Sequence, residues 1–157
     1  MKIKCIFCSK TNESYWIEAI KYYEKKLKNY VSIEIIELSD LKNTKNMDQK
    51  TIRQKEGELI LAKISATDKV ILLDDKGKEY TSMQLSEFIN QVQIQSTKSL
   101  VFVVGGAYGF SPEVYQRASS QLSLSKLTFS HQMVRVIFLE QLYRAYAIIH
   151  NEPYHHE

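Results

Sequence analysis

This chain has few of the residues that cross-link or bend a polypeptide: two cysteines, two prolines and five glycines among 157 residues. It also lacks any stretch near the roughly 20 consecutive apolar residues that a membrane helix needs. After Met1 a strand pattern begins at once, with no apolar segment leading to a small-residue cleavage site. We therefore expect no secretory signal, no membrane association and a cytoplasmic location.

The two cysteines, Cys5 and Cys8, form a C-x-x-C pattern within an apolar strand. Residues three apart on a strand point to opposite faces, whereas a redox pair needs a turn that leads into a helix. A zinc site would need two further ligands, and the chain has no second cysteine pair. We predict buried structural thiols and no metal site.

Two phosphate-binding motifs are missing as well. No G-x-G-x-x-G follows the first strand pattern, and no glycine-rich loop ends in Gly-Lys-Ser or Gly-Lys-Thr. The only glycine cluster is Gly105, Gly106 and Gly109, with Ala107 where a dinucleotide fingerprint would have its second glycine. These absences disfavour dinucleotide-binding and P-loop proteins.

The overall composition is that of an ordinary globular domain, with 44% hydrophobic and 25% charged residues. The length fits a single domain over residues 1–157. A net charge of +3 tolerates phosphate neighbours but does not by itself indicate nucleic-acid binding.

Strand and helix patterns alternate along the chain, which predicts an α/β domain with a mostly parallel sheet and helices on both faces. Thr81, Ser111 and Ser130 are each placed to cap a helix, and a long surface loop is expected over 39–50. The expected strands are Ile3–Cys8, Val31–Leu38, Lys69–Leu73, Leu100–Val104 and Leu122–Phe129, and the main helices are Ser14–Asn29, Asp48–Ile64, Thr81–Val92 and one after Ser130.

Three of the expected strands end in segments that could form a binding crevice. Leu73 closes the third, Gly105 and Gly106 follow the fourth, and Leu124–Phe129 leads toward the last helix. Strand ends of an open parallel sheet meet in one crevice, and glycines there let a ligand approach main-chain atoms. A tight turn with no ligand is the simpler explanation of the glycines taken alone.

Many separate motifs occur together in this chain, and their order carries a family resemblance. They are Tyr15-Trp16, Lys55-Glu56-Gly57, Leu72-Leu73-Asp74, Val103–Gly106, Leu122–Phe129, His131, Arg135-Val136, Leu142–Ala145 and Pro153-Tyr154-His155. In these motifs the chain closely resembles the RlmH family of SPOUT-class methyltransferases, which modify large-subunit ribosomal RNA.

The resemblance implies more than the spacing does. It implies a SPOUT-type fold with a C-terminal deep trefoil knot, a homodimer, and S-adenosylmethionine bound in the knot. The methyl group would go to N3 of a pseudouridine in helix 69 of 23S ribosomal RNA. One departure is Ser130, where many relatives have proline. Carried onto this sequence, the cofactor-binding residues are Leu73, Gly105, Leu124, Ser125, Lys126, Leu127, Thr128 and Phe129.

The catalytic residues implied by the resemblance and by side-chain chemistry are His155, Arg144 and Tyr154. His155 is the expected proton acceptor, since the unperturbed pKa of imidazole lies nearest cytoplasmic pH. Arg144 could bind a phosphate or stabilise charge on the uracil ring, and Tyr154 could stack on the base. A simple helical ion pair with Glu140 is the alternative role for Arg144.

The last helix pattern carries few charges between Met133 and Ile149. It therefore has more apolar surface than one buried stripe requires. A second chain could cover this surface, and so could the core of the same chain. With no added RNA-binding domain, we expect the shape of the assembled ribosome to contribute to recognition. A transfer RNA methyltransferase of the same fold and a non-catalytic ribosome-binding factor are the alternative functions.

Overall fold

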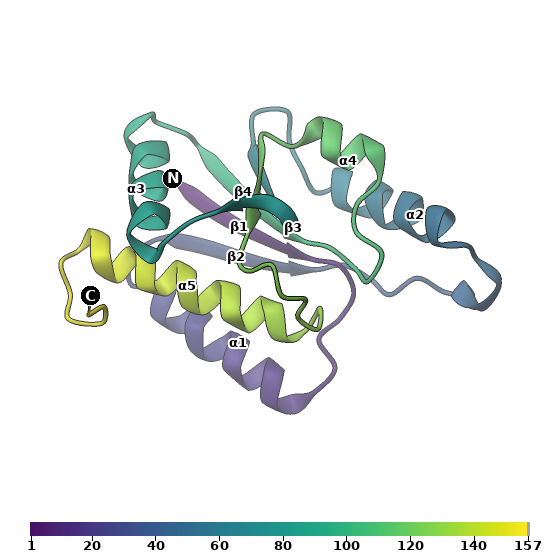
Figure 1. Ribbon diagram of the computed structural model, residues 1–157, viewed down its shortest axis with the longest axis horizontal. Helices are drawn as coiled ribbons and strands as arrows, with labels where there is room; N and C mark the ends of the chain where they lie inside the picture. Colours follow the sequence, from purple (N-terminus) through teal and green to yellow (C-terminus); the bar gives the residue numbers. More distant parts are fainter. Residues whose placement is uncertain (157) are drawn as a thin grey trace.

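A computed structural model describes residues 1–156, in which a five-stranded sheet carries helices on both faces (Figure 1). The strand order is β2-β1-β4-β3-β5, and every neighbouring pair is parallel, which confirms the predicted α/β architecture. The strands are β1 (Lys2–Phe7), β2 (Ser32–Glu37), β3 (Lys69–Glu79), β4 (Ser99–Val104) and β5 (Ser120–Ser123). The helices are α1 (Ser14–Leu27), η1 (Thr44–Asn46), α2 (Gln49–Leu61), α3 (Ser82–Ile94), α4 (Pro112–Arg117) and α5 (Met133–Ile149).

The central strand β4 shows why helices must cover both faces. All six of its residues are buried, as expected of a parallel strand with no solvated side. Leu100 and Phe102 pack with α1, α3 and α5, and the Phe102 ring centroid lies 4.7 Å from that of Phe138. Val101 and Val103 face the opposite layer, formed by α2 and α4. None of the helices within residues 1–156 is long and apolar enough to cross a membrane.

The two thiols lie in different layers of the core. Cys5 belongs to the cluster under α1, α3 and α5, whereas Cys8 belongs to the cluster under α2 and α4. Both are buried and reduced. The prediction of buried, diverging structural thiols is confirmed.

Strand β3 is longer than the sequence pattern predicted. It continues past Leu73 to Glu79, and its register against β5 shifts between Leu73 and Lys78. A Cβ atom at Gly77 would lie 2.7 Å from backbone atoms of Leu122, so glycine permits this close crossing of two main chains. The extension was missed because it is polar.

The strand expected over Leu122–Phe129 is wrong in its second half. Strand β5 ends at Ser123, and residues 124–130 form a loop. The Ser123 hydroxyl donates to the carbonyl of Ser125 at 3.1 Å, and the Ser125 hydroxyl accepts from the amide of Leu127 at 3.0 Å. Such local side-chain bonds favour turns over a strand ladder.

Two of the three predicted helix caps, Thr81 and Ser111, are confirmed. The Thr81 hydroxyl accepts a hydrogen bond from the amide of Gln84 at 3.2 Å, and the Gln84 side-chain oxygen accepts one from the Thr81 amide at 3.0 Å, which completes a capping box. Ser111 accepts from the amide at the third position of α4. Ser130 accepts from the amide of Met133 at 3.2 Å, but the residue at the N-cap of α5 is Gln132, so the prediction that Ser130 caps the last helix is wrong.

Candidate functional site

A cavity of about 450 Å³ opens where β3, β4 and β5 end. Its size falls within the range of small-molecule sites, and its place at the carboxyl edge of a parallel sheet is where such sites usually form. It is lined by Leu73, Asp74, Asp75, Val104–Ala107, Gly109, Phe110, Leu122, Leu124, Ser125 and Leu127–His131, together with Val134 of α5. We call it the first cavity.

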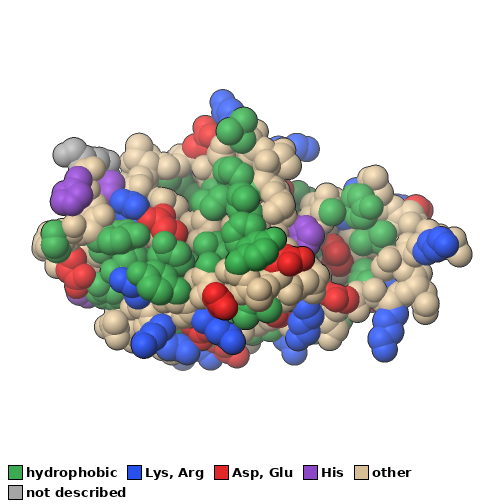
Figure 2. All heavy atoms as spheres, turned by 90° about the horizontal axis from the view of Figure 1, so that it is seen from below, with side chains coloured by type: hydrophobic (Ala, Val, Ile, Leu, Met, Phe, Trp, Pro, Cys, Tyr) green, Lys and Arg blue, Asp and Glu red, His purple; other side chains and the backbone are tan. Residues whose placement is uncertain are grey.

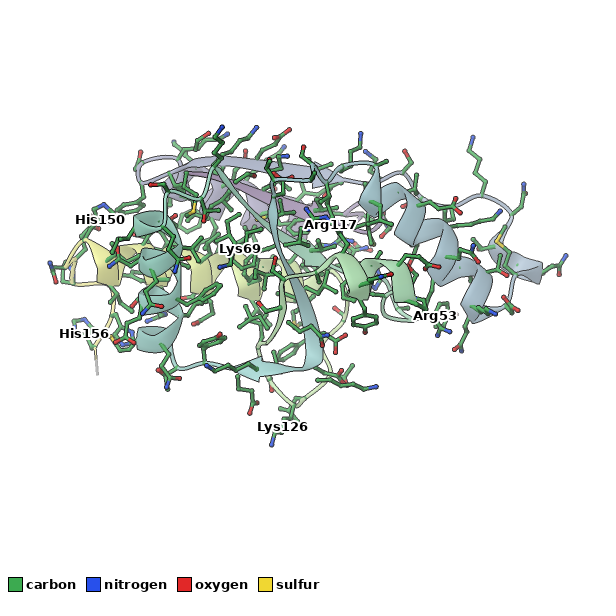
Figure 3. All side chains as sticks on the ribbon, turned by 90° about the horizontal axis from the view of Figure 1, so that it is seen from above. Arg53, Lys69, Arg117, Lys126, His150 and His156 are labelled. Carbon is green, nitrogen blue, oxygen red and sulfur yellow. The ribbon has the colours of Figure 1, made fainter. Side chains whose placement is uncertain are left out.

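All the cofactor residues expected from the sequence lie in this lining except Lys126. The Lys126 side chain instead extends away from the body of the protein (Figure 3). Leu127 lines the rim while remaining 74% exposed. The 124–129 loop thus offers apolar and main-chain groups to the cavity and directs its one charge outward.

Gly106 makes room for the Glu56 side chain behind the first cavity. A Cβ atom here would lie 2.6 Å from one carboxylate oxygen of Glu56 and 2.7 Å from the other. That approach is far inside van der Waals contact, so only glycine leaves the Glu56 side chain in place. The wall of the cavity at this point is therefore bare backbone.

Asp74 and Asp75 are site residues that the sequence reasoning missed. Both line the first cavity. The Tyr115 hydroxyl donates a hydrogen bond to Asp74, and burial together with this carboxylate raises the pKa of Tyr115 to about 12. An acidic pair at the cavity favours a ligand that carries positive charge. The signal was available, because two aspartates directly follow the apolar residues Val70–Leu73 of β3.

The start of α5 closes another side of the first cavity through His131 and Val134. Burial and the nearby Arg135 guanidinium both lower the pKa of His131 below its ordinary value, which favours the neutral imidazole.

Arg135 is fully buried beneath the connection between β1 and α1. It donates to the carbonyl of Cys8 at 2.6 Å, to the hydroxyl of Ser9 at 3.2 Å and to the hydroxyl of Thr11 at 2.8 Å. Burial lowers the pKa of Arg135, and the charge of Glu37 opposes that shift. The guanidinium therefore fastens the β1–α1 connection to the first turn of α5.

The three expected catalytic residues meet at the other end of α5. Glu140 accepts from Nη2 of Arg144 at 2.5 Å and from the Tyr154 hydroxyl at 3.2 Å. Nη1 of Arg144 lies 3.4 Å from Nδ1 of His155, and its guanidinium stacks 4.8 Å from the Tyr154 ring centroid. The helical ion pair considered from the sequence is present and is part of this group. We call these four side chains the tail cluster.

The tail cluster and the first cavity lie far apart within one chain. Val134 lines the cavity, whereas Arg144 follows ten residues later on the same helix, about 15 Å along its axis at 1.5 Å per residue. His150 and His156 mark the tail end of the molecule in Figure 3, well away from Lys126 on the cavity loop. A single chain does not bring its own tail cluster to its own cavity.

The described residues also hold no group of three or more histidine, cysteine, aspartate or glutamate side chains arranged to bind a metal ion.

Comparison with known proteins agrees with the α/β fold. A family model described as "Predicted SPOUT methyltransferase" matches residues 1–155. Three similar proteins are named ribosomal RNA large subunit methyltransferase H. The protein from Parabacteroides distasonis is 52% identical over 100% of both chains, that from Christiangramia forsetii 50% over 99% of both, and that from Flavobacterium johnsoniae 47% over 100% of both. The chain therefore belongs to the RlmH family of large-subunit ribosomal RNA methyltransferases, within the SPOUT class.

Proposed function

We propose that this protein transfers a methyl group from S-adenosylmethionine to N3 of a pseudouridine in helix 69 of 23S ribosomal RNA, on assembled ribosomes in the cytoplasm. The observation that carries the proposal is the first cavity, in which main-chain and apolar groups from the ends of three parallel strands converge in a chain of this family. The start of α5, which closes one side of this cavity, comes from the same C-terminal segment that the family resemblance assigns to the knot, and we include that knot in the proposal.

The first cavity suits S-adenosylmethionine in size and chemistry. Apolar side chains such as Leu124 and Phe129, with bare backbone at Gly105 and Gly106, fit a flat purine. Asp74 and Asp75 suit the positive charges of the sulfonium and the amino group. The bound cofactor supplies an electrophilic methyl group. The task of the protein is to orient the acceptor base and to remove its proton.

His155, Arg144 and Tyr154 would act on the acceptor base. The N3 proton must leave before the nitrogen lone pair can attack, and His155 is the proposed acceptor of that proton. Arg144 would stabilise the negative charge that develops on the uracil ring, and Tyr154 would stack on it. Their mutual contacts already hold these groups in one place.

We further propose a homodimer in which the tail cluster of one chain serves the first cavity of the other. The separation of about 15 Å along α5 within one chain favours this arrangement over a site built from one chain. Hydrophobic side chains gather on the side of the molecule that carries α1 and α5 (Figure 2). Tyr22, Leu127 and Met133 are large apolar residues left exposed in the single chain.

Labelled S-adenosylmethionine, incubated separately with intact ribosomes, isolated subunits and transfer RNA, tests the proposal. We expect transfer to ribosomes, with little to isolated subunits and none to transfer RNA. Efficient labelling of transfer RNA would instead support a transfer RNA methyltransferase. Binding to ribosomes with no transfer to any substrate would support a non-catalytic factor.

Two variants test the proposed catalytic roles. His155→Ala and Arg144→Ala should lose transfer to ribosomes while the circular dichroism spectrum and the cofactor affinity stay unchanged. His156→Ala is the matched control, because His156 is an exposed neighbour in the same tail. Unchanged rates in the first two variants would remove the catalytic assignment.

A further inference from the structure

A second cavity of about 540 Å³ lies beside the first, across the turn that follows β4. Gly106 and Gly109 of this turn line the first cavity, whereas Tyr108 between them lines the second. The other walls come from the β1–α1 connection, the 40–47 segment and α2, and they include Ser9, Asn12, Asp40 and Glu56. One turn of chain therefore separates two openings at the same edge of the sheet.

Glu56 is the least satisfied polar group of this second cavity. Its Oε2 is buried and has no hydrogen-bond partner among the residues that the structure describes. Burial raises the pKa of its carboxyl group, because the charged form loses water. A buried acceptor left without a donor is costly, and few occur in native proteins. The carboxyl group would be satisfied by a ligand that brings N–H donors.

The other residues that line the second cavity restrict further which kinds of ligand it could bind. Two carboxylates, those of Asp40 and Glu56, line the second cavity with one lysine, Lys45, so the cavity does not favour a phosphate. Tyr108 is 43% exposed, so much of this residue is accessible to a ligand. Tyrosine rings stack on unpaired nucleobases, and carboxylates accept from their amino groups.

The wall of the second cavity that the β1–α1 connection forms is also held in a fixed position. Ser9 adopts φ 74°, a left-handed backbone conformation that is strained for a residue with a side chain. Arg135 holds it there by bonds to the Cys8 carbonyl at 2.6 Å and to the Ser9 hydroxyl at 3.2 Å. Arg135 follows Val134, which lines the first cavity. Helix α5 therefore contributes to the first cavity directly and to the second through Arg135.

We propose that the second cavity binds a nucleobase with an exocyclic amino group, from a nucleotide of the RNA substrate close to the one that is methylated. Tyr108 stacks on this base, and Glu56 accepts from its amino group. The inference rests on the proposed function and deepens it, since it adds a specificity subsite to the acceptor RNA. A phosphate or a second part of the cofactor in this cavity is an outcome that the test distinguishes.

Two measurements on the variants Tyr108→Ala and Glu56→Gln test the inference. The first is the steady-state kinetics of ribosome methylation, and the second is calorimetric titration with S-adenosylmethionine. We expect KM for ribosomes to rise about 5-fold or more in each variant, as for the loss of a base stacking contact. Tyr108→Phe keeps the ring and should keep KM. Glu58→Gln, an exposed neighbour on α2, is the control for charge. Cofactor affinity should change less than 2-fold throughout.

The outcomes separate this inference from the proposed function. If the wild-type protein methylates ribosomes and both variants keep its KM, the nucleobase subsite is wrong while the function stands. If cofactor affinity falls while KM for ribosomes rises, the second cavity merely supports the first. If removing Lys45 by Lys45→Ala raises KM and Tyr108→Ala does not, the ligand is a phosphate. A wild-type protein inactive on ribosomes overturns both proposals.

Discussion

Replacing Arg135 by methionine should destabilise the protein strongly, because this guanidinium is fully buried and holds two segments together. Methionine has a similar length but carries neither charge nor donors. The change leaves the buried Cys8 carbonyl without its bond of 2.6 Å, at a cost of about 1–3 kcal/mol. It also removes the guanidinium from the Phe7 ring, 5.1 Å away, an interaction of about 2 kcal/mol when desolvated.

One effect opposes these losses. Burying a charge costs several kcal/mol, and methionine avoids that cost. Glu37, the nearest carboxylate at 3.9 Å, has a side chain that is only 28% exposed and would lose its counterion. Breaking a buried charge network by removing one partner is normally unfavourable overall, so we expect a loss on the order of 3 kcal/mol in the free energy of unfolding.

Urea unfolding followed by circular dichroism, at one fixed protein concentration, measures this loss. Thermal unfolding should show a Tm lower by about 6–12 °C, at 2–4 °C per kcal/mol for a chain of this size. Arg53→Met on α2 is the matched control, since Arg53 is partly exposed and belongs to no buried charge network described above. A loss below 1 kcal/mol for Arg135→Met would refute the view that this residue fastens the β1–α1 connection to α5.

Three further predictions concern a cap, the thiols and a buried acid. Thr81→Ala should cost about 1 kcal/mol in urea unfolding by removing the cap of α3, whereas Thr67→Ala in an exposed loop should be neutral. Burial, with the charge of Glu56, raises the pKa of Cys8 to about 12, and burial raises that of Cys5 as well. A chromogenic disulfide reagent at pH 8 should therefore label neither thiol until urea is added, and rapid native labelling would contradict this. Folding raises the pKa of the Glu56 carboxyl group above its ordinary value of about 4.5. As pH rises, the unfolded chain therefore loses this proton before the folded protein does. The free energy of unfolding then falls with pH until the folded carboxyl group has ionised as well. Glu56→Gln should gain stability over the wild type between pH 4 and 8, and a constant difference would refute the burial cost.

The predictable parts of the fold are those in which a local sequence pattern alone determines the secondary structure. Strand β4 is apolar from Leu100 to Val104 because both of its faces are covered, and Thr81 and Ser111 mark helix starts through short-range bonds. The second half of β3 follows no such pattern. It is polar and pairs with β5 through main-chain bonds that a close approach at Gly77 makes possible, and that approach depends on tertiary structure.

The same distinction applies to the candidate site. The first cavity could be expected because parallel strand ends meet at one edge, so Leu73, Gly105 and most of the 124–129 loop were placed correctly in its wall. The second cavity joins four segments that no period or motif connects in the sequence. Ser9, Asp40, Glu56 and Tyr108 meet only because β1, β2, α2 and β4 are stacked in a particular order.

The length of α5 has a consequence for how this protein would behave at low abundance. If cofactor and proton acceptor reside on different copies, an isolated copy holds only half of what one turnover needs. The rate per molecule would then decline on dilution below the dissociation constant of the pair, and adding an inactive copy with an intact tail would restore it. Cellular concentration would thereby set not only how much catalyst is present but whether any is assembled.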